Sequence, residues 1–212
     1  MAVHAPVQEN MQEMVSLWGW ANEQQSWNWA GSIGKPLKVN VYSNCPEVRL
    51  ELNGKVIGTK PVSADTKLTT TFEVPYEAGE LKAIAIKDGK DVESKILKTS
   101  GKAAKIKLTA DRQTIRADRN DLSYITIEVT DEAGQLVPDA NLSINFKIEG
   151  AGELAGVENG NPTDMKSFQS PKVSSFNGKC LVILRPRGSS GKIELTAESA
   201  GLQKAEITIK TN

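Results

Sequence analysis

One stretch of the sequence decides the fold: Gly150-Ala151-Gly152-Glu153-Leu154-Ala155-Gly156-Val157-Glu158-Asn159-Gly160-Asn161-Pro162-Thr163-Asp164, then a polar run to Asn177-Gly178, then Lys179-Cys180-Leu181-Val182-Ile183-Leu184-Arg185-Pro186-Arg187. Alternating residues before it (141–148) and an apolar run at its end (180–184) both predict β-strands. A long loop without periodicity is uncommon inside a compact β domain, and it is either functional or held down by its own side chains. The stretch therefore predicts a β-sandwich whose long loop is a packed cap or contacts a ligand or partner.

The same β pattern continues on both sides of this stretch. In the second half, short alternating segments are separated by turn signals at 131–134, 138–139, 189–191 and 200–201. The predicted strands there cover residues 106–110, 124–130, 142–148, 180–184, 193–197 and 205–210. In the first half, Asn53-Gly54 and Asp88-Gly89 each stand between alternating segments. Such dipeptides are strong hairpin signals because both turn positions favour positive φ.

These patterns predict an all-β chain with two immunoglobulin-like antiparallel sandwiches in tandem. We expect an irregular tryptophan-rich strap over residues 1–36, a small sandwich over 37–100 and a larger C-terminal sandwich over 101–212. The boundary between the sandwiches follows from the small polar residues at 99–102.

The strap holds all four tryptophans of the chain, Trp18, Trp20, Trp27 and Trp29. Each indole is a large apolar group with one N–H that needs a partner. Three roles remain open: anchors on a neighbouring domain, a stacking platform for carbohydrate, or an interface with an absent domain. We expect at least one of these side chains to be packed on the first sandwich and at least one to be partly exposed.

Composition excludes several classes of function. Lys and Arg total 26 and Asp and Glu total 26, so no net field attracts nucleic acid or an anionic membrane. No apolar run is long enough to span a membrane, and residues 1–36 lack the pattern of a signal peptide. Cys45 and Cys180 lie in different predicted domains, so we expect no disulfide, and Cys180 suits a buried apolar position.

Catalytic signals are missing. His4 has no nucleophile beside it in the sequence, and the common hydrolase, phosphate-loop and metal motifs are absent. The carboxylates Glu153, Glu158 and Asp164 share the long loop, but nothing fixes the separation that a glycosidase pair requires. We therefore expect no catalytic residue, no metal site and no cofactor. Glu158, Asn159, Asn161 and Asp164 remain candidates for a carbohydrate or interdomain contact, together with the tryptophans.

Two groups of motifs resemble glycoside hydrolase family 2 enzymes of the β-galactosidase type. Trp18-Gly19-Trp20, Gln25-Ser26-Trp27-Asn28-Trp29-Ala30-Gly31 and Val48-Arg49-Leu50-Glu51-Leu52-Asn53-Gly54-Lys55 resemble the segment that follows the catalytic barrel. Gly150-Ala151-Gly152-Glu153-Leu154, Val157-Glu158-Asn159-Gly160-Asn161-Pro162-Thr163-Asp164 and Phe176-Asn177-Gly178-Lys179 resemble the C-terminal immunoglobulin-like domain of the same enzymes.

The resemblance implies a non-catalytic accessory role. Family members are retaining hydrolases with two glutamates on a (β/α)8 barrel, and this chain has no room for such a barrel. Asn22-Glu23 echoes the family's Asn-Glu pair but stands in the strap, so no catalytic residue is carried over. We expect the chain to be the C-terminal part of a periplasmic or extracellular glycosidase, packed on the absent barrel. A carbohydrate-binding module and adhesin-like structural repeats are the alternatives.

Overall fold

The computed structural model describes residues 1–7, 10–15, 17–19 and 21–212, and this part of the chain is all-β apart from one 3-10 helix, Ala30–Ser32. It divides into two compact units, Met1–Thr99 and Ser100–Asn212, which we call unit 1 and unit 2. The all-β fold class is thus confirmed. Residues 1–36 belong to the same compact unit as residues 37–99.

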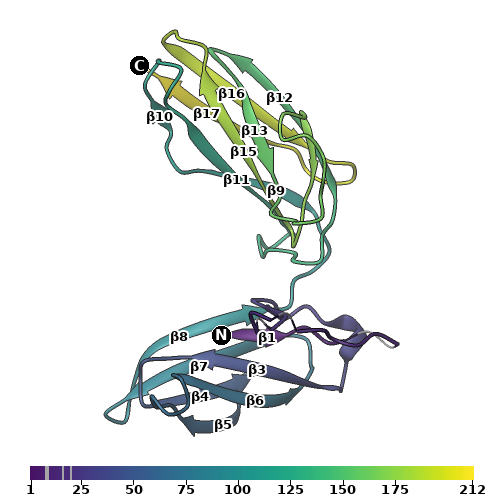
Figure 1. Ribbon diagram of the computed structural model, residues 1–212, viewed down its shortest axis with the longest axis vertical. Coiled ribbons are helices and arrows are strands. Elements are labelled where there is room, and N and C mark those ends of the chain that lie inside the picture. Colours follow the sequence, from purple (N-terminus) through teal and green to yellow (C-terminus); the bar gives the residue numbers. More distant parts are fainter. Residues whose placement is uncertain (8–9, 16, 20) are drawn as a thin grey trace. The chain divides into compact units, whose positions relative to one another are not determined.

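Unit 1 consists of two four-stranded sheets, with strand orders β2-β1-β3-β6 and β5-β4-β7-β8 (Figure 1). Every strand pair in these sheets is antiparallel. The strands are β1 (Ala2–His4), β2 (Glu23–Gln24), β3 (Pro36–Tyr42), β4 (Glu47–Leu52), β5 (Lys55–Pro61), β6 (Thr69–Pro75), β7 (Glu80–Lys87) and β8 (Lys90–Lys98).

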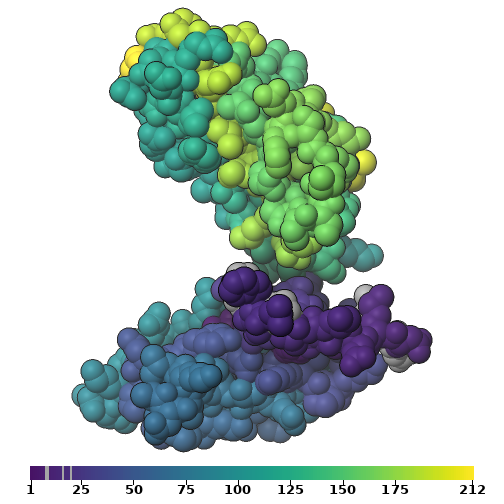
Figure 2. Space-filling view, viewed as in Figure 1, coloured from purple at the N-terminus to yellow at the C-terminus, as the bar shows by residue number. Residues whose placement is uncertain are grey.

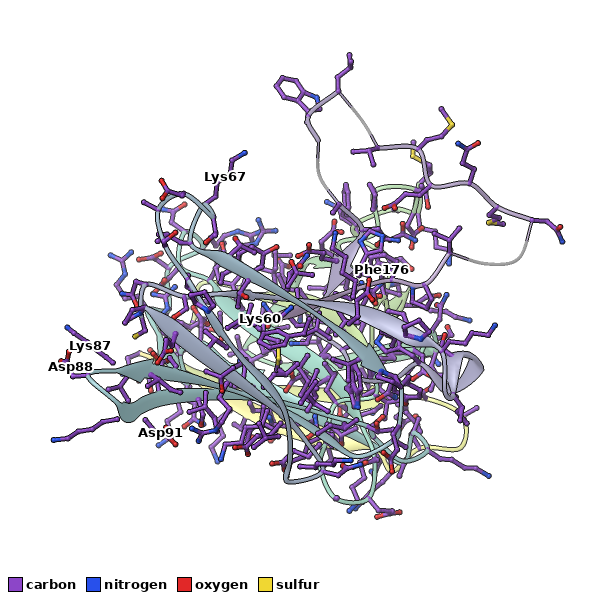
Figure 3. The ribbon with its side chains drawn as sticks, turned by 90° about the horizontal axis from the view of Figure 1, so that it is seen from below. Lys60, Lys67, Lys87, Asp88, Asp91 and Phe176 are labelled. Atoms are coloured by element: carbon purple, nitrogen blue, oxygen red, sulfur yellow. The ribbon has the colours of Figure 1, made fainter. Side chains whose placement is uncertain are left out.

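Both predicted hairpins are present in unit 1. Asn53 and Gly54 have φ of 51° and 76° and join β4 to β5, whereas Asp88 and Gly89, with φ of 53° and 70°, join β7 to β8. Figure 3 shows Lys87 and Asp88 at the tip of the second hairpin. Positive φ at both turn positions gives the backbone the twist that matches two antiparallel strands.

The N-terminal segment contributes strands and core residues to unit 1. β1 pairs with β3 through Val3 and Val39, and β2 pairs with β1 on the other side. Val3 and Trp27 are fully buried in the same cluster as the alternating inward residues of β3 and β4. β1 has three residues and β2 has two, and such short strands cannot show an alternating pattern. The sequence therefore predicts only an irregular strap there.

Unit 2 is a larger sandwich of a five-stranded sheet, β10-β17-β16-β12-β14, and a four-stranded sheet, β13-β15-β11-β9 (Figure 1). Its core is formed by inward residues of both sheets, among them Ile125, Leu184 and Leu195, which are fully buried. The strands are β9 (Lys105–Ala110), β10 (Thr114–Ile115), β11 (Ser123–Thr130), β12 (Ser143–Gly150), β13 (Gly152–Glu158), β14 (Lys172–Ser174), β15 (Lys179–Pro186), β16 (Gly191–Glu198) and β17 (Ala205–Thr211).

The long loop is shorter than the sequence predicts, because its first part is the strand β13. β13 pairs with β15 and carries a bulge between Leu154 and Gly156, which breaks the alternation of buried and exposed side chains. Gly152 also packs so tightly that a Cβ there would lie 2.4 Å from Ile193 Cδ1. The irregular backbone is therefore confined to residues 159–171, before β14, and to residues 175–178, between β14 and β15.

Cys180 lies in the core of unit 2, as its apolar surroundings in the sequence predict. Burial raises the pKa of its thiol to about 12, so the group is an unreactive neutral thiol. Cys45 and Cys180 are both free cysteines.

Candidate interaction surfaces

The segment between β1 and β2 carries the largest group of exposed apolar side chains in unit 1. Its described residues 7, 10–15, 17 and 18 leave the edge of the sheet, and we call them the docking segment. The exposed fractions are Val7 50%, Met11 67%, Met14 91%, Val15 56%, Leu17 106% and Trp18 82%. In Figure 2 the dark purple residues of the N-terminal segment lie on the outside of unit 1.

Hydrogen bonds close the base of this excursion. The amide of Ala5 donates to the carbonyl of Asn22 over 2.8 Å. Glu13 bridges the same two ends: its Oε2 lies 2.9 Å from His4 Nε2, and its Oε1 accepts the amide of Asn22 over 3.4 Å. Glu13 thus ties the base of the excursion together, whereas Met14, Leu17 and Trp18 are exposed to solvent.

The tryptophans fall into different environments. Trp27 is fully buried, its ring meets Tyr76 edge to face at 5.0 Å between centroids, and its Nε1 donates to the carbonyl of Glu77 over 2.9 Å. Trp29 is half-buried against the core and donates to the carbonyl of Ser26. Trp18 is exposed, and Trp20 lies outside the described residues. One indole is therefore packed and another exposed, as the sequence leads us to expect.

Glu23, the acid of the Asn22-Glu23 pair, serves as a hydrogen-bond acceptor at the surface of the sheet. It accepts Asn40 Nδ2 over 2.6 Å and the hydroxyl of Tyr42 over 2.5 Å. The hydrogen bond to Glu23 is the main reason that the pKa of Tyr42 rises to about 12. These hydrogen bonds tie β2 to β3 across the intervening strand β1.

The four candidate residues of the long loop are close together, and their polar groups bond to each other and to the loop backbone. Asn159 Nδ2 donates to Asp164 Oδ2 and to the carbonyl of Ser174, both over 2.9 Å. Glu158 Oε1 accepts the amides of Asn159 and Gly160. Asn161 Oδ1 accepts the amide and hydroxyl of Thr163. These side chains hold the irregular backbone in place.

Glu153 lies apart from this network, in a cluster of arginines. Its Oε1 accepts Arg185 Nη2 over 2.8 Å and Arg119 Nη2 over 2.9 Å, and Arg187 Nε lies 3.8 Å from its Oε2. The Arg185 guanidinium is the main cause that lowers the pKa of the Glu153 carboxyl. Glu153 is thus an ion-pair partner and lacks the raised pKa of a general acid.

The described residues show no candidate metal site and no membrane-spanning helix. No group of three or more His, Cys, Asp or Glu side chains in residues 1–7, 10–15, 17–19 and 21–212 could hold a metal ion. No helix in the same ranges is long and apolar enough to cross a membrane.

Two family models match the chain, one in each unit. Residues 106–208 match the glycoside hydrolase family 2 C-terminal domain 5, and residues 34–93 match a domain of unknown function (DUF4982). Together the two matches lie within the two sandwiches described above.

Relatives among characterised proteins are glycosidases. A β-galactosidase of Bacteroides ovatus is 44% identical over 184 residues, which cover 86% of this chain and 21% of that protein. A β-glucuronidase of Formosa agariphila is 27% identical over 87% of this chain and 19% of its own length. The chain therefore spans about a fifth of the relatives it matches.

Solved structures agree with this assignment. A family 2 glycosyl hydrolase from Bacteroides cellulosilyticus superposes with a TM-score of 0.92 and 39% identity, covering 100% of this chain and 28% of that one. A β-glycosidase from Bacteroides vulgatus gives a TM-score of 0.83 and 32% identity over 87% of this chain and 24% of its own. The chain belongs to glycoside hydrolase family 2, and it corresponds to the C-terminal region of relatives that are β-galactosidases and β-glucuronidases.

Proposed function

We propose that this chain is the accessory part of a longer, retaining β-galactosidase-like enzyme and that its docking segment packs against the catalytic barrel of that enzyme. The observation that carries the proposal is the exposure of Met14, Leu17 and Trp18, each more than four-fifths accessible to solvent. The family resemblance is the basis for the retaining mechanism and for a periplasmic or extracellular location.

The docking segment exposes several large apolar side chains to solvent. Burying a leucine or methionine side chain is worth about 1.5–3 kcal/mol, and a tryptophan covers about 150–250 Å² when packed. Contiguous apolar patches on a protein surface mark interaction sites. A partner therefore gains free energy of association from each of Met14, Leu17 and Trp18 that it buries.

Because the base of the docking segment is anchored, binding a partner would cost less conformational entropy. Because Glu13 joins His4 to the backbone of Asn22, the excursion leaves unit 1 from a fixed point. Fewer conformations have to be given up on binding when a projection is anchored at its base. The catalytic barrel is the proposed partner because the relatives that share this region are several times longer and are glycosidases.

The first test is the reading frame upstream of the codon for Met1, which should encode a (β/α)8 barrel. In the longer enzyme, the double variant Leu17→Ser/Trp18→Ser should lower the thermal midpoint of the barrel and its activity. Ile33→Ser is the matched control, because Ile33 is 74% exposed in unit 1 but lies outside the docking segment. An upstream frame without a barrel, or equal effects of the double variant and the control, contradicts the proposal.

The isolated chain should be inactive on chromogenic galactosides, glucuronides and mannosides. This follows because Glu153 is paired with arginines and Glu158 with backbone amides, so neither is poised for acid or base chemistry. Turnover that disappears in Glu153→Gln or Glu158→Gln would contradict this expectation.

A further inference from the structure

Unit 2 gathers arginines at one end of its four-stranded sheet, and we call Arg119, Arg185 and Arg187 the arginine cluster. The chain has only six arginines, and five of them lie within residues 112–119 and 185–187. Arg185 belongs to β15, Arg187 follows this strand, and Arg119 lies in the connection between β10 and β11. Two segments far apart in the sequence thus bring three guanidinium groups to the same carboxylate on β13.

Positive charge is in excess at the arginine cluster. Among the described residues, Glu153 is the only carboxylate that forms an ion pair with any of its three arginines. By contrast, Arg112 and Arg116 are paired with three aspartates of the segment 111–121. Like charges that are held close together repel each other. Three guanidinium groups around one carboxylate therefore attract a further anion.

The arginine cluster also has N–H donors to spare, since each guanidinium carries five. Arg185 donates to Glu153 through Nε and Nη2, and Arg119 donates through Nη2. Arg187 Nε lies 3.8 Å from Glu153 Oε2, which is beyond hydrogen-bond range. Among the described residues Arg187 thus has no hydrogen-bond acceptor for its guanidinium, and its side chain is more than half exposed. A planar guanidinium of this kind binds a carboxylate through two parallel hydrogen bonds.

An exposed tyrosine lies beside the arginine cluster on the same face of the sheet. Tyr124 pairs directly with Ile183, and Arg185 is two residues further along β15. Opposite residues of paired strands and alternate residues of one strand share a face, so these three side chains project together. That face is the outer one, because Ser123 and Ile125 on either side of Tyr124 are fully buried. Tyr124, which is 39% exposed, therefore presents an aromatic ring next to the guanidinium groups.

We propose that this face of unit 2 binds an acidic glycan. The arginine cluster holds the carboxylate of a uronate unit, and the ring of Tyr124 packs against the C–H groups of a sugar ring. The excess positive charge selects an anion, whereas the tyrosine selects a sugar over other anions. An open sheet face suits a polymer, because a glycan chain can lie along it. The inference concerns unit 2 alone, so it can fail or hold independently of the docking segment in unit 1.

The test is a titration of the ¹⁵N-labelled chain with tetragalacturonate at low salt, followed by NMR. Saturable shifts should concentrate at the amides of Tyr124, Arg185 and Arg187, and the affinity should fall as salt is added. Fully methyl-esterified tetragalacturonate lacks the charge, and tetraglutamate has the charge but no sugar. Each should bind about tenfold more weakly than tetragalacturonate. If the ester binds equally well, the arginines play no part, and if tetraglutamate does, the surface fits an acidic peptide; either result overturns the proposal.

Four variants locate the site. Arg187→Gln and Arg119→Gln should each weaken binding roughly threefold to tenfold, the loss of about one charge-assisted hydrogen bond. Tyr124→Thr keeps a residue that suits a strand but removes the ring, and it should weaken binding by about the same factor. Lys147→Gln is the matched control and should leave binding unchanged. It also removes one positive charge from unit 2, but from the other sheet, at an exposed ion pair with Glu149.

The NMR spectrum of each free variant shows whether unit 2 remains folded. Absence of saturable shifts, or equal effects of the arginine variants and Lys147→Gln, overturns the proposal. Binding that Tyr124→Thr leaves unchanged overturns the assignment of a sugar.

Discussion

The docking segment and the loop at 159–171 are both irregular, yet they use their side chains in opposite ways. In the loop, Asn159 and Asn161 bond to neighbouring backbone and side-chain groups, so the loop folds onto itself. In the docking segment, Glu13 bonds only at the base, while Leu17 and Trp18 are exposed to solvent. Irregular backbone alone therefore does not mark a functional surface, because what matters is whether its side chains are already satisfied.

The largest expected effect distinguishes a packed tryptophan from an exposed one. Trp27→Ala should destabilise unit 1 by about 3–5 kcal/mol, because it removes a fully buried ring and its hydrogen bond to Glu77. Trp18→Ala should change the stability of the isolated chain by less than about 0.5 kcal/mol. Urea unfolding of both variants measures the difference. Equal losses would show that Trp18 is part of the core of unit 1.

The turn that closes the loop is the next most sensitive point. Gly178 has φ of 74°, and a Cβ there would lie 2.3 Å from the carbonyl oxygen of Val137. Gly178→Ala should therefore cost unit 2 more than about 2 kcal/mol, since left-handed strain and a backbone clash add up. Gly160→Ala is the control, because Gly160 has a similar φ but open space around it. Thermal unfolding of the two variants should show the larger shift for Gly178→Ala.

A smaller effect tests whether the loop holds itself in place. Asn159→Ala removes the two bonds that its amide donates to Asp164 and Ser174 and should cost about 1–3 kcal/mol. The loop should also become more sensitive to limited proteolysis between residues 161 and 172. Lys166→Ala, an exposed position in the same loop, serves as the control. If both variants are cleaved at the wild-type rate, the network around Asn159 does not restrain the loop.

The smallest effect is the pH dependence that Glu153 contributes to the stability of unit 2. Since its arginine partners lower the pKa of Glu153 in the folded state, its stabilising contribution is present above the unfolded pKa of about 4.3. The contribution is lost as the pH falls through the lower folded value. Glu153→Gln should flatten the acid limb of the stability curve of unit 2, whereas Leu17→Ser should leave it unchanged. Denaturation midpoints between pH 5 and pH 2 test this.

The longer strands of both sandwiches, except β13, could be predicted because their patterns are local. Leu50 and Leu52 alternate with polar residues up to Asn53-Gly54, and the turn dipeptide fixes where the chain reverses. Each of these signals spans a few residues and is independent of what packs on the strand. The all-β class and the family resemblance follow from such motifs.

Other features depend on distant partners and could not be predicted. β1 is a strand because Val3 pairs with Val39 of β3, and Trp27 is buried because Tyr76 and Glu77 lie beside it. β13 could not be predicted because its bulge breaks the alternation of buried and exposed side chains. The bonds of Asn159 and Glu158 likewise form only once the loop is closed, so the sequence alone leaves open whether the loop is a cap or a contact.

The placement of the tryptophans also has a spectroscopic consequence. All four lie between residues 18 and 29, so unit 2 contains no indole chromophore. Intrinsic emission above the tyrosine band therefore reports on unit 1 alone, while far-ultraviolet circular dichroism sums the strands of both units. Trp27, shielded in the core, should supply a blue-shifted emission that acrylamide quenches slowly, and Trp18 a red-shifted one that it quenches fast. In a denaturant series, any gap between the fluorescence and dichroism midpoints measures directly how far the two sandwiches unfold separately.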